Sequence, residues 1–256
     1  MDAFAMLRLQ IEWGADDALD TDPVDRLREV ARPAHTPIAP RPAPAKVASS
    51  EPARGTPAER ALAAAGQSAN LEALRAAIAA FDGCALRDTA GHLVFAEGDP
   101  SAGLLLIGEA PGADEDRTGH VFAGREGALL DKMLASIHLK RDHMLMTPLI
   151  PWRPPGGRPP NAGEIAVCLP FLHRLISLTR PTRVVLLGAL AAHTLLPATA
   201  RRRRSAAAWA DATIPGIPDA IPFLPLPGLS ALVKNPLERR EAWTGLRILR
   251  RALDET

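Results

Sequence analysis

A short apolar run that stops in a glycine- and proline-rich turn constrains this chain more than any other feature. Residues 103–107 are apolar, and the turn Gly108-Glu109-Ala110-Pro111-Gly112 follows directly. Beyond the turn, residues 114–116 are all acidic, and Phe122 precedes an amphipathic stretch. A buried strand that ends in such a turn is typical of the carboxyl edge of an α/β sheet, where ligands bind. We therefore expect a ligand site around residues 108–122.

Apolar runs alternate with amphipathic segments along the rest of the chain. Strands are predicted at residues 103–108, 143–150, 183–188 and 223–226. Helices are predicted at about 71–81, 125–138, 162–178, 189–196 and 236–253, and residues 197–222 are expected to be irregular. Strands rich in Leu, Ile and Val that alternate with helices favour a parallel sheet covered on both faces. The sequence predicts a three-layer α/β/α fold with a mostly parallel central sheet.

The composition changes sharply before this pattern begins. Residues 1–30 are predicted to form a short N-terminal helical extension, and residues 31–66 are rich in proline and alanine. Such a stretch buries too little apolar surface to offset its ordering entropy, so we expect a flexible linker there. Residues 67–256 are then expected to form a single α/β domain.

Bulk properties exclude some classes of protein. No run of 18 apolar residues is present, so we expect no membrane span. The only two cysteines, Cys84 and Cys168, fit a reducing cytoplasm, and the histidines lack metal-ligand spacing. A net charge of +1 neither favours nor excludes nucleic acid as a partner. The four arginines at 201–204 fit a DNA-binding surface and a solvated loop equally well.

Four ordered segments resemble the uracil-DNA glycosylase superfamily, specifically its type 4 group. They are residues 108–124, the rigid loop 153–158, the segment 164–188 and the loop 230–236. The resemblance covers roughly residues 70–253 and implies a uracil-DNA-glycosylase-like fold. It also implies an enzyme of base-excision repair that flips uracil or another deaminated base out of DNA and hydrolyses its N-glycosidic bond. The implied partner is DNA, and we expect a monomer without membrane contact.

The resemblance also assigns roles to particular residues. The candidate catalytic carboxylates are Glu109 and Glu115, which we leave unranked; such a group orients water and offsets the charge that develops on the sugar. The expected substrate-binding residues are Gly108, Ala110, Pro111, Gly112 and Phe122, whose ring would stack on the base. The expected DNA-binding residues are Arg153, Arg158, Ser230 and Lys234. The plainer alternatives are a solvated turn acid for Glu109 and a core aromatic for Phe122.

Three features of the family pattern are missing or incomplete. Pro148 aligns with the family's uracil-reading Asn, and Gly228 aligns with its His. His120 either substitutes for that imidazole or is an ordinary surface histidine. At the four positions of the family's iron–sulfur ligands stand Phe81, Cys84, Trp152 and Cys168. Two thiolates cannot hold a four-iron cluster, so we expect no cofactor. The alternatives to a glycosylase are a catalytically weakened DNA- or damage-binding relative and an unrelated hydrolase on the same sheet.

Overall fold

The computed structural model describes residues 55–198 and 208–255. The chain divides into two units, Met1–Glu51 and Pro52–Thr256, and every described residue belongs to the second. The predicted N-terminal extension, residues 31–54 of the predicted linker and the arginines at 201–204 lie outside the described residues.

A six-stranded sheet forms the centre of the second unit, in the order β1-β3-β2-β4-β6-β5. The strands are β1 (Glu97–Gly98), β2 (Leu104–Gly108), β3 (Leu145–Pro148), β4 (Arg183–Leu187), β5 (Ala210–Ala212) and β6 (Ile221–Leu226). The four inner strands are parallel, and β1 and β5 pair antiparallel at the edges. The sheet is therefore mostly parallel, as predicted.

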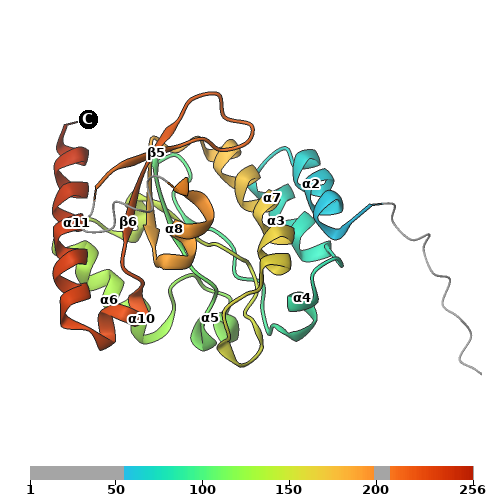
Figure 1. Ribbon diagram of the computed structural model, residues 1–256, viewed down its shortest axis with the longest axis horizontal. Coiled ribbons are helices and arrows are strands. Elements are labelled where there is room, and N and C mark those ends of the chain that lie inside the picture. Colours follow the sequence, from blue (N-terminus) through green and yellow to red (C-terminus); the bar gives the residue numbers. More distant parts are fainter. Residues whose placement is uncertain (1–54, 199–207, 256) are drawn as a thin grey trace, which may run out of the picture. The chain divides into compact units, whose positions relative to one another are not determined.

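Helices cover both faces of this sheet (Figure 1). One face carries α2 (Pro57–Gln67), α3 (Leu71–Ala80), α4 (Ala85–Thr89), α7 (Ala162–Thr179) and α8 (Ala189–Leu195). The other carries α6 (Gly124–Ala135), α10 (Leu229–Lys234) and α11 (Pro236–Asp254). In β2, Leu105 and Ile107 pack in the first layer while Leu104 and Leu106 pack in the second. This alternation confirms the three-layer α/β/α class.

The predicted linker is wrong over its last part, because residues 57–67 form α2. Thr56 and Glu59 form a capping box, and Pro57 occupies the first turn, where proline is favoured. Ala61 and Ala65 are buried against α7, and the Arg174 guanidinium of α7 donates to the Ser68 carbonyl oxygen just after α2. A proline count alone misses such a helix, since it does not distinguish a helix-starting proline from a linker proline.

Helix α7 is the longest apolar segment of the described chain. The sequence led us to expect no membrane span. By length and composition, however, α7 is the one described helix that could cross a membrane. Six of its residues are nonetheless buried, among them Phe171 and Leu175, and α2 and α3 pack against it. In this fold α7 is a core helix.

Several short elements were not predicted. They are α4, α5 (Ala113–Thr118), α10, β1, β5 and the 3-10 turns η1 (Arg141–His143) and η2 (Pro155–Gly157). Strand β5 lies within residues 197–222, which we expected to be irregular. Elements of two to six residues are too short to display a full hydrophobic period, so the sequence pattern gives little signal for them.

Candidate active site

A cleft of about 600 Å³ opens where the inner strands end. Strand β2 lies between β3 and β4. The chain runs from β2 to β3 on one side and then crosses to β4 on the other side, so the direction of strand order reverses at β2. Ligands bind at such a switch point in open α/β sheets. The predicted site residues that line the cleft are Gly108, Glu109, Ala110, Pro111, Gly112, Glu115, Phe122, Arg153, Arg158 and Ser230. Of the predicted set, only Lys234 is not part of the lining.

Phe122 has an unusual backbone conformation in this cleft. Its φ angle is 50°, in the left-handed region, which costs a non-glycine residue on the order of 1–3 kcal/mol. The side chain is only 7% exposed, and its ring lies against the end of β2. A Cβ atom on Gly108 would lie 2.7 Å from the Cε1 atom of the ring. Gly108 is therefore the residue that lets the aromatic ring cover the strand end.

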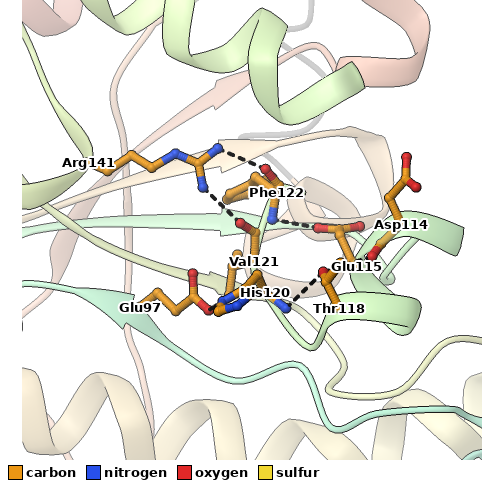
Figure 2. Close-up of polar contacts among 8 residues, drawn as sticks. All are labelled: Glu97, Asp114, Glu115, Thr118, His120, Val121, Phe122 and Arg141. Carbon is orange, nitrogen blue, oxygen red and sulfur yellow. Dashed lines mark hydrogen bonds and ion pairs between the residues drawn. The ribbon is translucent and has the colours of Figure 1, made fainter. Parts of the chain in front are cut away.

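Hydrogen bonds from two sides hold the Phe122 backbone (Figure 2). Its N–H donates to Glu115 Oε1 at 2.7 Å, and its carbonyl oxygen accepts from Arg141 Nη2 at 2.8 Å. Arg141 Nη1 also donates to the Val121 carbonyl oxygen, and Arg141 Nε donates to Asp131. These contacts offset the strain and fix the orientation of the ring in advance of any ligand.

Glu115 uses both carboxylate oxygens for backbone contacts. Besides Phe122, it accepts from the Gly112 N–H at 2.6 Å through Oε2, which caps α5. Burial raises the pKa of Glu115, and its two backbone hydrogen bonds act in the opposite direction. Glu115 thus connects the turn after β2 to Phe122, and its geometry is that of a positioning residue.

The two carboxylate oxygens of Glu109 differ, because only one of them accepts a hydrogen bond from a described residue. The Oε1 atom accepts from the Leu190 N–H at 2.8 Å, at the start of α8. A Cβ on Gly188 would lie 2.2 Å from the Glu109 Cδ atom, so only glycine leaves room for this contact. The second oxygen, Oε2, accepts no hydrogen bond from any residue that the structure describes. It lies 3.2 Å from the position of a Cβ on Gly228.

Further charges surround this carboxylate. Glu126 lines the same cleft, and partial burial raises its pKa. The Lys234 charge lowers the pKa of Glu126 and the Glu109 charge raises it, so both groups lie within electrostatic reach of Glu126. Lys234 therefore acts on the site from the end of α10, although it does not line the cleft.

The two arginines of the loop 153–158 differ in whether their guanidinium groups already have partners. Arg158 forms a two-pronged ion pair with Glu164 at 2.6 and 2.9 Å, which anchors the loop to α7. Arg153 forms no ion pair with a described residue, and its buried Nε–H has no hydrogen-bond partner among them. A buried unsatisfied donor is costly, and an anionic ligand in the cleft would satisfy it. Of the two guanidinium groups, that of Arg153 has the fewer partners among the described residues.

Comparison with known families matches this architecture. The family model of the Uracil DNA glycosylase superfamily matches residues 95–247, which include β2, the cleft-lining turn and most of α11. The chain belongs to the uracil-DNA glycosylase superfamily.

Individual members of the superfamily are similar over part of their length. A type-4 uracil-DNA glycosylase of Pyrobaculum aerophilum is 35% identical over 133 residues, which are 52% of this chain and 68% of the relative. One of Archaeoglobus fulgidus is 40% identical over 109 residues, 43% of this chain and 55% of the relative. One of Sulfurisphaera tokodaii is 37% identical over 120 residues, 46% and 54% respectively. The chain thus spans little more than half the length of two of these relatives.

Two of the positions that depart from the superfamily pattern lie in or beside the cleft. Pro148 ends β3 and lines the cleft, where it offers neither a side-chain amide nor a backbone N–H. Gly228 is adjacent to Glu109 Oε2 and precedes α10. His120 does not line the cleft; its ring is 72% exposed and its Nδ1 atom lies 2.7 Å from Glu97 Oε1 (Figure 2). His120 is therefore a surface histidine.

The residues at the superfamily's cluster positions do not fit an iron–sulfur cluster. Phe81 and Trp152 are buried in the same core layer as Cys84 and Cys168, and the Phe81 ring packs edge-on against Phe171 with centroids 5.3 Å apart. The Cys168 thiol donates to the Cys84 sulfur, which lowers the pKa of Cys84 to about 7. The described residues hold no group of three metal-ligating side chains. Two thiols beside two packed aromatics cannot supply the four ligands.

Sequence reasoning missed three residues of the site. Arg141 and Asp131 brace Phe122, and Gly188 makes room for Glu109. An arginine between a helix and a strand carries no distinguishing signal. Gly188 does carry one, because it is the last residue of the parallel strand predicted at 183–188, and ligand-binding turns occur at such strand ends.

Proposed function

We propose that this protein is a DNA glycosylase that hydrolyses the N-glycosidic bond of uracil, or of another deaminated base, after flipping the nucleotide into the cleft. Family membership supports the class of reaction. The observation that carries the proposal is the pairing of Glu109 Oε2, which has no partner among the described residues, with the pre-oriented Phe122 ring in one cleft. We include in the proposal a monomeric, cytoplasmic protein that works without an iron–sulfur cluster.

In this proposal the flipped base stacks on Phe122, which is already held in its conformation by Glu115 and Arg141. Backbone groups of the turn 108–112 contact the polar edge of the base. As the bond between the base and the sugar C1′ atom breaks, positive charge develops on the sugar. Glu109 offsets that charge and orients the attacking water through Oε2. Arg153 binds a phosphate that flanks the flipped nucleotide.

Glu109 ranks above Glu115 as the catalytic carboxylate in this mechanism. Both oxygens of Glu115 already accept backbone N–H groups, so a role in chemistry would break contacts that hold Phe122. Glu109 keeps one oxygen for α8 and offers the other to the substrate. A carboxylate fixed by one hydrogen bond and free at its second oxygen suits a group that must orient water.

A second candidate function is favoured by Pro148 and Gly228. Without an amide at the end of β3 and an imidazole beside Glu109, the cleft has fewer groups to stabilise the leaving base. A relative with such a cleft would bind uracil-containing or damaged DNA without cleaving it.

The deciding experiment measures free uracil released from single- and double-stranded oligonucleotides that contain one uracil, with thymine in the control strand. Release that depends on Glu109 supports the glycosylase. Salt-dependent binding that prefers the uracil strand, with no release, selects the second candidate. Neither release nor preference for uracil would overturn both.

A pair of restoring substitutions adds a gain-of-function test. Gly228 has a φ of −68°, which any residue adopts, and its Cβ position is tight but not blocked. The double variant Pro148→Asn, Gly228→His should raise uracil release above that of the unchanged chain. A matched Gly228→Ala variant fills the same space without an imidazole and should not.

A further inference from the structure

One exposed stripe of α11 combines arginines with an aromatic side chain. Arg240, Trp243, Arg247 and Arg251 follow one another at helical spacing, and all four are exposed. Trp243 is 47% exposed, one of the three large hydrophobic side chains exposed in the described chain. The opposite side of α11 carries the buried residues Ala242, Gly245, Leu246 and Leu249 and packs on α6, α10 and β6. The stripe therefore points away from the core.

The three arginines of this stripe are available for a partner. Their guanidinium groups form no hydrogen bond or ion pair with a described residue; Arg240 accepts a bond from the Thr244 hydroxyl only through its backbone carbonyl oxygen. The two other arginines of α11 are engaged: Arg250 pairs with Asp254, and Arg239 donates to the carbonyl oxygens at the end of α10. The free guanidinium groups thus gather on one side of the helix.

The stripe lies on the helix that directly follows the cleft-lining helix α10. Ser230 and Val233 of α10 line the cleft, and Lys234 is the last residue of α10. Asn235 then caps both α10 and α11, so the two helices follow without a linker (Figure 1). With 19 residues, α11 extends for about 28 Å at roughly 1.5 Å per residue. Lys234 and the three arginines of the stripe thus lie on two consecutive helices, the first of which lines the cleft.

We propose that this stripe of α11 is a second nucleic-acid contact, which binds the strand that continues from the nucleotide in the cleft. The guanidinium groups bind its phosphates, and a base stacks on Trp243. Arginine with an exposed aromatic is the combination that holds single strands without reading their sequence. An anionic membrane fits less well, because the apolar face of α11 is buried in the core and leaves Trp243 as the one aromatic side chain to insert.

The test measures binding of the full chain to undamaged single-stranded oligonucleotides of about 30 and about 6 nucleotides over a range of salt concentrations. Arg247→Gln should weaken binding of the long strand and reduce the slope of log affinity against log salt by about 0.7, the value of one single-strand phosphate. Arg75→Gln is the matched control, because Arg75 is exposed on α3 without a described partner. It should leave both quantities unchanged.

Substitution of the aromatic separates stacking from charge. Trp243→Ala should weaken binding of the long strand about 5- to 150-fold, the range for one lost base–aromatic stack, and Trp243→Phe should restore most of it. Neither variant should alter binding of the short strand, which the cleft alone accommodates.

The proposed path of the strand rests on the proposed glycosylase function. The outcomes below distinguish failure of the α11 contact from failure of the glycosylase. Equal effects of Arg247→Gln and Arg75→Gln, or an equal loss with the short strand, would overturn the α11 contact even if uracil is released. If Arg247→Gln and Trp243→Ala weaken binding of the long strand alone and the chain releases no uracil, the α11 contact is supported and the glycosylase function is refuted. Binding to phosphatidylserine vesicles that needs Trp243, with no effect on DNA, would replace the nucleic acid by a membrane.

Discussion

Replacing each candidate carboxylate by its amide separates the role of Glu115 from that of Glu109. A glutamine at 115 has one oxygen, so it can accept only one of the two N–H groups that now donate at 2.6 and 2.7 Å. The other N–H would face an NH₂ donor. An unsatisfied, partly buried N–H costs about 1–3 kcal/mol. For a domain of this size, a loss of about 2 kcal/mol lowers the melting temperature by roughly 4–8 °C.

A glutamine at 109 behaves differently. Its oxygen still accepts the Leu190 N–H, and the lost charge near the start of α8 costs at most about 1 kcal/mol. The melting temperature should therefore change little. If Glu109 acts on the developing sugar charge, kcat for uracil release should fall about 10²- to 10⁴-fold while DNA affinity stays the same. Glu115→Gln should instead raise KM, because the stacking platform loses its support.

The measurements are thermal unfolding by circular dichroism and uracil release under single-turnover conditions, with Glu126→Gln as a matched change of another carboxylate in the cleft. A Glu115→Gln variant that keeps its melting temperature but loses the chemical step would refute the positioning role. Unchanged release by Glu109→Gln would place the chemistry on another group. The stability comparison holds even if the unchanged chain only binds DNA.

The remaining predictions concern the stacking platform, the cofactor and the first helix. Phe122→Ala should weaken capture of a uracil-containing strand by roughly 1–3 kcal/mol, measured by anisotropy; unchanged affinity would mean that the ring is a core aromatic. The purified protein should be colourless, and metal analysis showing about four irons per chain would contradict this. A chain that begins at Ser68 should melt at a lower temperature than one that begins at Thr56, because it lacks Ala61 and Ala65 against α7. Equal melting of the two truncated chains would show that α2 adds no stability.

The sequence was sufficient wherever the physical signal is local. Strand β2 and its turn, helix α7 and helix α11 are long or strongly patterned, and each was predicted within a few residues. The capping pair of α3, in which the Asn70 side chain accepts from the Ala73 N–H, is also a contact between near neighbours. Even the missed helix α2 carries its start signal in Thr56, Pro57 and Glu59. Such features depend on backbone propensity and on periods that the residue order displays.

The relation between the two carboxylates depends on the tertiary structure. Glu109 and Leu190 are 81 residues apart in the chain, and Arg141 reaches Phe122 across 19 residues. Arg153 and Arg158 belong to one loop, and the sequence does not show that only Arg158 has an ion-pair partner among the described residues. By itself the sequence determined an α/β sheet, the edge at which ligands bind and the set of polar side chains gathered there. Which of those side chains stays free for a substrate is decided only when folding brings distant hydrogen-bond partners together, because a donor satisfied within the protein is no longer available to a ligand.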